Sequence, residues 1–421
     1  MAGRLGVGPG GREVGLSRVR YLAGLVFSPI SRRLAAITDS ATLAVSARAV
    51  AMRAAGRPVI GFAVGEPDFP TPGHIVEAAQ RAAANPRAHH YSPAAGLPEL
   101  REAVVMKSLR DSGLECAMEN VTITVGAKGA VYGACVALLD EGDEVLIPSP
   151  YWVSYPDIVS LAGGVVRTVP ATLASGYRVS VDDLEAARTP RTKMLIFCSP
   201  NNPSGAVYPR DEVIAIGQWA ARHGIWVLTD EIYEHLVYGD AVFSSMPVEV
   251  PEVGERCIVV NSVAKTYAMT GWRVGWLIGP PVVAAAVGRL QSHTTSNVTN
   301  VSQFAALAAL GGPMDSVWQM RVAFDRRRRL MHDLLRAIPG VDAPEPEGAF
   351  YAFPGVDPQR ALPGRGASTT LEVAQVLLEM AEIAVVPGEA FGAPGSLRLS
   401  FALGDDDLVA GLQRWRALTG A

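Results

Sequence analysis

The stretch Asn261-Ser-Val-Ala-Lys265-Thr-Tyr-Ala-Met-Thr-Gly-Trp-Arg273-Val-Gly-Trp276 follows an apolar run, 257–260, that has the character of a buried strand. It places one lysine among small and hydroxyl-bearing residues, with one arginine eight positions later. A primary amine becomes a useful nucleophile when burial or a neighbouring cation lowers its pKa, and its commonest use is a Schiff base with an aldehyde cofactor. A solvent-exposed loop lysine is the ordinary alternative. The stretch alone leaves both interpretations of Lys265 open.

Strand-like and helix-like segments alternate around that stretch. Short apolar runs predict strands at 59–64, 121–125, 144–147, 165–169, 193–198 and 226–229. Apolar residues at helical spacing predict helices at 72–84, 97–112, 128–139, 154–162, 181–187 and 211–223. Strands separated by helices predict an α/β fold with a mostly parallel sheet that is covered on both faces.

The chain is long enough for two domains. It has 421 residues, of which 49% are hydrophobic, and a single core usually stops growing at about 250–300 residues. From about residue 314 the composition changes to a long Arg-rich helix, short strand-like runs and a helix at 370–382. We therefore expect a large domain at 69–313 and a smaller α+β domain at 31–68 plus 314–421. The Gly- and Arg-rich residues 1–30 are expected to be a disordered extension, since their short apolar stretch lacks a clear cleavage site.

Composition excludes several classes of protein. The formal net charge of -4 provides no basic surface for nucleic acid. No segment has the roughly 18 uninterrupted apolar residues that a membrane span requires. The four cysteines lack the spacing of a metal site or a disulfide scaffold. We therefore expect a cytoplasmic protein with no nucleic-acid partner, no membrane partner and no metal.

Candidate binding residues follow several of the predicted strands directly. Ligands of open α/β sheets bind beyond the carboxyl ends of the strands. Gly126-Ala-Lys128 opens a helix there, and its N–H groups and helix dipole would favour an anion such as phosphate. Trp152 could stack on a planar ring, Asn202 could donate to an oxygen anion, and Asp230 could hold a ligand. Taken singly, each has an ordinary alternative: chance placement, buried packing, a turn or a helix cap.

Taken together, the motifs form an ordered set that resembles one family. They are Gly65-Glu-Pro-Asp-Phe69, Tyr91-Ser-Pro-Ala-Ala-Gly96, Ser149-Pro-Tyr-Trp152, Asn201-Asn-Pro203, Asp230-Glu-Ile-Tyr233, Ser262-Val-Ala-Lys265 with Arg273, and Arg398-Leu-Ser-Phe401. From Arg33 to Arg416 the chain is similar to the class I pyridoxal-phosphate-dependent aminotransferases, and within them to the bacterial aspartate aminotransferase subgroup. The resemblance implies fold type I, and it favours the reactive interpretation of Lys265.

The resemblance assigns a cofactor, pyridoxal 5'-phosphate, and the residues that bind it. Lys265, Asp230 and Tyr233 would be catalytic. Lys265 would form a Schiff base with the cofactor, and Asp230 would keep the ring nitrogen protonated. Tyr233 and Asn202 would hydrogen-bond the ring's 3-oxygen, and Trp152 would stack on the ring. The phosphate would be bound by Gly126, Ala127, Lys128, Ser262 and Arg273, with Tyr91 contributed by a neighbouring subunit.

The resemblance also assigns the substrate contacts and the reaction. Arg398 would clamp the α-carboxylate, a bidentate task that suits arginine. Thr42 and Lys128 would bind the distal carboxylate of aspartate or glutamate, and the remaining substrate contacts would come from Gly65, Trp152 and Asn202. The implied reaction moves an amino group from L-aspartate or glutamate to 2-oxoglutarate or oxaloacetate by a ping-pong mechanism. Because the site is shared between subunits, a homodimer is implied.

The resemblance leaves the substrate open and makes two further predictions. Relatives with aromatic, prephenate or specialised biosynthetic substrates could keep every residue named above. Relatives that transaminate prephenate carry a lysine where this chain has Thr38, so we expect poor prephenate turnover. The peptide bonds Ser149–Pro150 and Asn202–Pro203 are expected to be cis, an uncommon state.

Overall fold

A computed structural model describes residues 30–37 and 41–420 of the chain. Residues 30–37, which contain the short helix α1 (Arg32–Ala35), belong to a unit separate from the rest. Residues 41–420 belong to one compact unit. The expectation for residues 1–29 and the one that rests on Thr38 lie outside the described residues.

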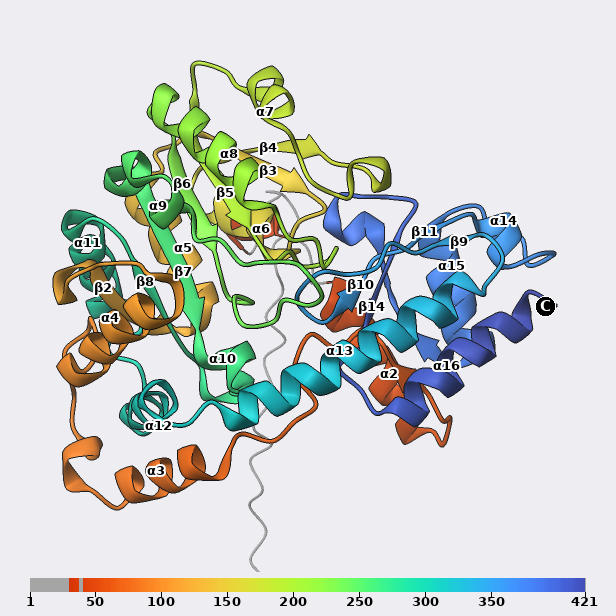
Figure 1. The fold of residues 1–421 in the computed structure, drawn as a ribbon, viewed down its shortest axis with the longest axis horizontal. Coiled ribbons are helices and arrows are strands. Elements are labelled where there is room, and N and C mark those ends of the chain that lie inside the picture. Colours follow the sequence, from red (N-terminus) through yellow and green to blue (C-terminus); the bar gives the residue numbers. More distant parts are fainter. Residues whose placement is uncertain (1–29, 38–40, 421) are drawn as a thin grey trace, which may run out of the picture. The chain divides into compact units, whose positions relative to one another are not determined.

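The centre of the larger unit is a seven-stranded sheet with the order β2-β8-β7-β6-β5-β3-β4 (Figure 1). The strands are β2 (Val121–Val125), β3 (Glu144–Ser149), β4 (Val165–Pro170), β5 (Thr192–Cys198), β6 (Trp226–Asp230), β7 (Cys257–Ser262) and β8 (Val274–Ile278). β8 runs antiparallel to both of its neighbours, and the other paired strands of this sheet are parallel. The prediction of a mostly parallel sheet is confirmed.

Alternate residues of the central strands face opposite layers of helices. In β5, Met194 and Ile196 pack into one apolar cluster, whereas Leu195 and Phe197 pack into another. One face is covered by α5 (Gly126–Leu138), α6 (Ser154–Leu161) and α11 (Pro281–Ser292). The other is covered by α4 (Pro98–Ser112), α8 (Arg210–His223) and α12 (Asn300–Gly311), with α3 (Gly73–Ala83) packed on α12. Burial on both faces explains why these strands read as nearly continuous apolar runs.

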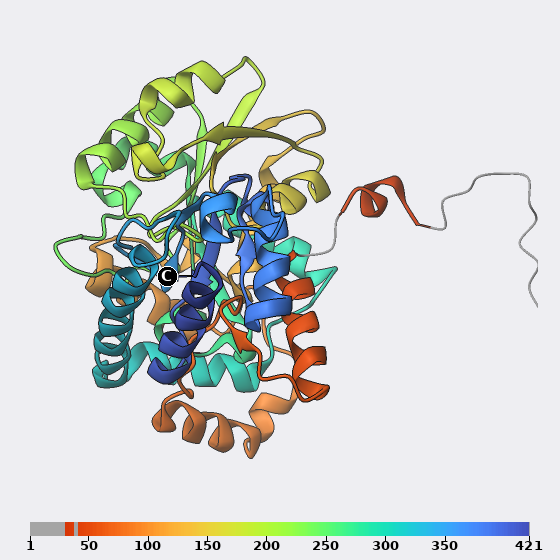
Figure 2. The same ribbon diagram turned by 90° about the vertical axis from the view of Figure 1, so that its right-hand side faces the viewer.

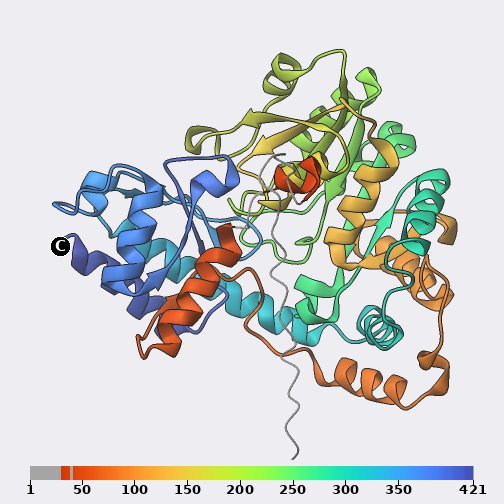
Figure 3. The ribbon, with the colours of Figure 1, turned by 180° about the vertical axis from the view of Figure 1, so that it is seen from behind.

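A further layer combines the beginning and the end of the larger unit. Figures 2 and 3 show α2 (Ala41–Ala54), in red, beside the blue C-terminal segments. The short strand β1 (Ile60–Gly61) pairs in parallel with β12 (Ile383–Ala384), which joins the two parts. Helix α13 (Asp315–Arg336) packs along α16 (Asp405–Leu418). The smaller elements are β9 (Val341–Asp342), β10 (Tyr351–Ala352), β11 (Gly355–Val356), α14 (Pro358–Ala361), α15 (Thr370–Val376), β13 (Val386–Pro387) and β14 (Leu397–Ser400).

Several predicted elements differ from those observed. The strand expected at 59–64 is only β1, because β12 offers it two residues to pair with. The helix expected at 370–382 ends at Val376, and a wider π-type turn follows at Leu377–Ala381. Strand β8 and helices α11 and α12 were not predicted. The division into domains at 69–313 and 31–68 plus 314–421 stays a prediction.

Two smaller expectations can be compared with the structure. Ser149–Pro150 and Asn202–Pro203 are cis as predicted, and Ser199–Pro200 is cis as well. None of the described helices combines the length and the apolar character needed to cross a membrane.

Candidate active site

A cavity of about 490 Å³ lies where β5, β6 and β7 end. Its lining brings together most of the residues singled out in the sequence: Thr42, Gly65, Ala127, Lys128, Trp152, Asn202, Asp230, Tyr233, Ser262, Lys265, Arg273 and Arg398. It also includes residues that the sequence did not single out, among them Glu66, Tyr155, Cys198, Thr270 and Tyr351. The fold therefore provides space for a ligand beyond the carboxyl ends of these strands, as expected for an open α/β sheet.

Lys265 enters the cavity from the short helix α10 (Val263–Thr266), which follows β7 directly. The Ser262 side chain caps this helix by accepting from the backbone N–H of Ala264 at 2.9 Å. Lys265 Nζ donates to the carbonyl oxygen of Gly65 at 2.5 Å. Burial lowers the pKa of the amine to about 8; Glu66 opposes this, whereas the cations Arg398 and Arg273 add to it. A lysine in this state supplies the neutral amine that a nucleophile needs.

Asp230, the last residue of β6, is fixed by two hydrogen bonds. Its Oδ2 accepts from the hydroxyl of Tyr155 at 2.7 Å, and its Oδ1 accepts from the backbone N–H of Ile232 at 3.3 Å. Burial raises the pKa of the carboxyl, and the two hydrogen bonds work against that shift. A buried carboxylate of this kind would stabilise a positive charge within hydrogen-bonding distance of its oxygens. Tyr155 lies in α6, and its contact with Asp230 has no signal in the sequence.

Arg398, in β14, is 2% exposed and is paired with no carboxylate of the described residues. Its guanidinium donates to Asn202 Oδ1 at 3.1 Å and to the carbonyl oxygen of Ala63 at 2.8 Å, and its Nε has no partner. The rings of Tyr351 and Phe391 lie 4.5 and 5.0 Å from the guanidinium carbon. Burying a cation without a counter-ion is costly, so this position is suited to bind an anion from outside the chain.

The start of α5 and Arg273 form a second place for an anion. Gly126 and Arg273 both have positive φ, 69° and 56°, and the N–H of Gly126 donates to the carbonyl oxygen of Arg273 at 3.1 Å. The positive φ at position 126 favours glycine, because other residues rarely adopt it without strain. The N–H groups at the helix start and the guanidinium together favour a phosphate. Gly126 does not itself line the cavity, whereas Ala127 does.

Lys128 and Thr42 both line the cavity, as does Trp152. Lys128 Nζ is 5.0 Å from the centre of the Trp152 ring. Burial lowers the pKa of Lys128, and Arg273 lowers it further, whereas Asp157 opposes the shift. Thr42 Oγ1 is buried and has no hydrogen-bond partner among the described residues. A cation and such a hydroxyl in one cavity could bind a second carboxylate.

Tyr233 and Tyr91 differ in their surroundings. Tyr233 is fully enclosed, and its hydroxyl lies 3.2 Å from the hydroxyl of Tyr351. Tyr91 is 90% exposed and does not line the cavity. A role for Tyr91 at this site would require a second copy of the chain.

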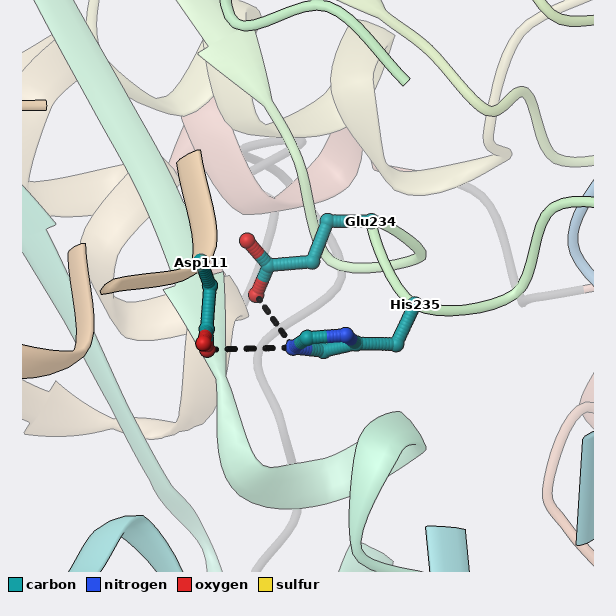
Figure 4. Close-up of side chains that lie close together, drawn as sticks. All are labelled: Asp111, Glu234 and His235. Carbon is teal, nitrogen blue, oxygen red and sulfur yellow. Dashed lines mark hydrogen bonds and ion pairs between the residues drawn. The ribbon is translucent and has the colours of Figure 1, made fainter. Parts of the chain in front are cut away.

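One group of metal-ligating side chains converges outside the cavity. Among the described residues it consists of Asp111, Glu234 and His235, whose ligand atoms lie within 4.8 Å of one another. Figure 4 shows the His235 ring pointing at both carboxylates, with Nε2 at 3.1 Å from Asp111 and 3.8 Å from Glu234.

Cations already meet both carboxylates of this group. The ammonium of Lys107 contacts Glu234 and lies 3.6 Å from Asp111. Arg110 donates to both oxygens of Asp111, at 2.6 and 3.0 Å. We therefore interpret these five residues as an ion-pair cluster, in which Arg110 is exposed, and not as a metal site.

Comparisons with known proteins connect the cavity to a group of enzymes. Residues 57–413 match the family model described as aminotransferase class I and II. The chain is 60% identical over 391 residues to a protein of Streptomyces avermitilis named aspartate aminotransferase, and the match covers 92% of this chain and 96% of that protein. It is 43% identical to a Cereibacter sphaeroides protein named aspartate/prephenate aminotransferase, over 92% of this chain and 98% of that one.

A solved structure agrees with these matches. The aspartate aminotransferase of Thermus thermophilus with maleate superposes with a TM-score of 0.88 at 40% identity. The match covers 93% of this chain and all of that one.

Proposed function

Because the chain belongs to the class I and II aminotransferases, we propose that it moves an amino group between L-aspartate or L-glutamate and the oxo acids oxaloacetate and 2-oxoglutarate. The observation that carries the proposal is that Lys265 and Arg398 line the same cavity. Lys265 is an amine with a pKa of about 8, and Arg398 is a buried cation without a carboxylate partner among the described residues. Such a pair suits a substrate that brings an amino group and a carboxylate together. The names of the relatives support the choice of dicarboxylic amino acids.

Pyridoxal 5'-phosphate fits the groups that line the cavity. The start of α5, Ser262 and Arg273 would hold its phosphate, and Asp230 would face its ring nitrogen. Tyr233 and Asn202, which line the cavity, would hydrogen-bond its 3-oxygen, and Trp152 would offer an aromatic face. When bound, pyridoxal phosphate supplies a conjugated ring that accepts the electron pair released as the substrate loses its Cα proton.

Lys265 would attach the cofactor through Nζ and then act as a base. At a pKa of about 8, about a tenth of the amine is neutral at pH 7, against less than about a thousandth at the ordinary lysine value. After an incoming amino acid displaces it, the neutral amine can take the proton from the substrate Cα. Lys265 would later return that proton on the cofactor side, and water would then release the first oxo acid by hydrolysis of its bond to the cofactor nitrogen. Release of the first product before the second oxo acid enters is a ping-pong order.

Arg398 and Lys128 would position the substrate from its two ends. The two N–H groups of the Arg398 fork suit a bidentate grip on the α-carboxylate, with Gly65 and Asn202 beside it. Lys128 and the hydroxyl of Thr42 would bind the distal carboxylate. Animal-type aspartate aminotransferases use an arginine of the partner subunit for that task. The matching region of this chain, 291–297, contains no arginine, so we propose Lys128 as the cation.

A homodimer would complete the site. Tyr91 is the one cofactor-binding candidate that stands exposed, away from the cavity. We propose that the Tyr91 hydroxyl reaches the phosphate of the cofactor bound by a second copy of the chain. The homodimer is proposed from the family resemblance, and a cytoplasmic location is proposed from the scattered cysteines.

The experiment that tests this function mixes the purified holoenzyme with L-aspartate and, separately, with L-phenylalanine. We expect L-aspartate to change the absorbance band of the cofactor at low concentration and to yield oxaloacetate. L-phenylalanine should do so only weakly, because Lys128 would face no carboxylate. An unchanged band with L-aspartate, together with a change with another amino acid, would replace aspartate by that substrate.

An alternative substrate is suggested by the name of the Cereibacter sphaeroides relative. Prephenate also carries two carboxylates, so the same cavity could receive it. Our expectation of poor prephenate turnover rests on Thr38, which lies outside the described residues. Efficient prephenate turnover by the purified protein would overturn that expectation and leave the aminotransferase assignment intact.

A further inference from the structure

Tyr351 lines the cavity and contacts two of its functional groups. It belongs to β10, which pairs antiparallel with β14, the strand that carries Arg398. Its hydroxyl lies 3.2 Å from the Tyr233 hydroxyl, and its ring centre lies 4.5 Å from the Arg398 guanidinium. The sequence motifs assign no role to this residue.

The aromatic ring of Tyr351 supports the guanidinium of Arg398. Arg398 lies within 5.0 Å of the rings of both Tyr351 and Phe391. Within the described part of the chain, only Asn202 and the Ala63 carbonyl accept its hydrogen bonds. A cation over an aromatic face is stabilised most when it is desolvated, and Arg398 is buried. The ring therefore helps to hold the guanidinium plane in place while no anion is bound to it.

The hydroxyl of Tyr351 reaches the other side of the cavity. Its contact with Tyr233 is the one hydrogen bond that either hydroxyl makes within the described part of the chain. Gly65 permits this approach, because a Cβ at position 65 would lie 3.2 Å from the Tyr351 hydroxyl. The carbonyl of the same Gly65 holds Lys265 Nζ. One hydroxyl thus lies beside the groups that serve the cofactor ring and the catalytic amine.

We propose that Tyr351 is a positioning residue that acts on both ends of the site, through its ring on Arg398 and through its hydroxyl on Tyr233. A hydroxyl has one proton to donate and two lone pairs. When Tyr351 donates to the Tyr233 oxygen, the proton of Tyr233 is free for the 3-oxygen of the cofactor. The inference rests on the proposed function, since it takes that oxygen to be the acceptor.

Two substitutions separate the ring from the hydroxyl. Tyr351→Phe keeps the ring over Arg398 and removes the hydroxyl, whereas Tyr351→Leu removes both. The control is Tyr238→Phe, because Tyr238 is also a buried tyrosine, donates to the Ala349 carbonyl at 2.6 Å and lies 5.4 Å from a cation, Arg328, outside the cavity. Thermal unfolding of every variant shows whether the fold is retained.

The hydroxyl is tested by the pH midpoint of the cofactor's absorbance change in the holoenzyme. The charged and titratable groups that face the two hydroxyls are Arg398, Cys198 and Glu66. Lys265 and Asp230 line the same cavity. Tyr351→Phe leaves all of these in place, so we expect the midpoint to rise by about 0.4 to 1 pH unit, the effect of one lost hydrogen bond to the deprotonated form. The Tyr238→Phe control should leave the midpoint unchanged.

The ring is tested by the binding of maleate, a dicarboxylate without an amino group, measured by titration calorimetry of the holoenzyme. Tyr351→Phe should bind maleate within about twofold of the unsubstituted protein, since the aromatic face remains. Tyr351→Leu should bind it at least about tenfold more weakly, because a desolvated cation–π contact is lost. Equal maleate affinity in Tyr351→Leu and the unsubstituted protein would overturn the role of the ring.

A double substitution tests whether the hydroxyl acts through Tyr233. In a Tyr233→Phe background, Tyr351→Phe should shift the midpoint no further, because the group it orients is gone. Additive shifts, or no shift in Tyr351→Phe alone, would contradict the inference. Failure of the proposed function is seen separately, in the unsubstituted protein, as an absorbance band that L-aspartate does not change.

Discussion

The cavity around Lys265 and the ion-pair cluster around Lys107 lie near the carboxyl ends of the same strands, and they treat buried cations differently. Lys107 is 3% exposed, and the carboxylates of Glu234 and Asp111 surround its ammonium. Lys265 faces a backbone carbonyl, that of Gly65, and no carboxylate lies within ion-pair distance of it among the described residues.

Arg398 extends the contrast to a second cation of the cavity. It has no carboxylate partner among the described residues and keeps an unpaired Nε, whereas Arg328, also buried, pairs with Asp325 at 2.8 Å. An unpaired buried charge reduces stability, so a fold retains it only where a bound group compensates. The difference is one of pairing: the two cations that we propose to bind ligands lack a carboxylate partner among the described residues, whereas Lys107 and Arg328 have one.

The largest effect is expected from Lys265→Ala. Turnover of L-aspartate should fall by about 10²- to 10⁴-fold or more, because the general base is lost. Cofactor should still be retained through the phosphate and ring contacts, and the unfolding temperature should not drop, because the removed charge was unpaired. Near-normal turnover in steady-state assays would contradict the assignment of Lys265.

Lys107→Met tests the other side of the comparison. Removing this cation leaves Glu234 and Asp111 buried without it, so the free energy of unfolding should fall by about 3–5 kcal/mol. Lys193→Met is the matched control, since Lys193 pairs with Asp143 at 2.7 Å near the surface, and its loss should cost less than about 1 kcal/mol. If urea unfolding showed the same loss of unfolding free energy for Lys107→Met and Lys193→Met, the ion pairs of Lys107 would not be what stabilises the cluster.

Arg398→Lys keeps the positive charge at the proposed α-carboxylate site and removes the two parallel N–H donors of the guanidinium. The value of kcat/KM for L-aspartate should fall by about 100-fold, since lysine cannot replace two parallel charge-assisted hydrogen bonds. Arg328→Lys, at a paired position, should lower the stability and leave kcat/KM nearly unchanged. A similar loss of activity in both variants would show that the guanidinium of Arg398 does not bind the substrate carboxylate through two hydrogen bonds.

The pKa of Lys265 makes the capture of cofactor by the apoprotein depend on pH. The value of about 8 lies below that of an unfolded lysine, so the reactive neutral amine increases with pH and levels off above 8. Between pH 6 and pH 8 the neutral fraction rises about 50-fold, and the rate of absorbance change on mixing with pyridoxal phosphate should rise with it. A rate that is independent of pH over this range would contradict a lowered pKa.

Lys128→Gln should have the smallest effect and the most selective one. Activity with L-aspartate should fall by about tenfold, because one charge-assisted contact to the distal carboxylate is lost. Activity with L-phenylalanine should stay within about twofold. An equal decrease for both substrates would indicate that Lys128 serves the cofactor and not the distal carboxylate.

The residues of the cavity that could be predicted from the sequence follow strands. Asp230, Ser262 and Lys265 come at or just after the ends of buried apolar runs, where the fold class itself places ligands. Tyr155 and Tyr351 could not be found this way. Each reaches its partner only after segments distant in the sequence have packed, such as β10 against β14.

The same limit explains the parts of the fold that were missed. The antiparallel β8 is a short run, Val274–Ile278, that contains Gly275, so its pattern is weak. The ion-pair cluster joins α4 to residues that follow β6, and Lys107 lies 127 positions before Glu234. From the sequence, Lys107 is one polar residue of a helix, because nothing local shows that its face is buried.

The central claim, that the unpaired amine of the cavity holds the cofactor, is tested most directly by reducing the holoenzyme with borohydride and locating the modified lysine by peptide mass spectrometry. We expect the pyridoxyl group on the peptide that contains Lys265, and none on Lys107, whose ammonium is paired. Attachment at Lys128 or at any other lysine, or no attachment at all, would contradict the account.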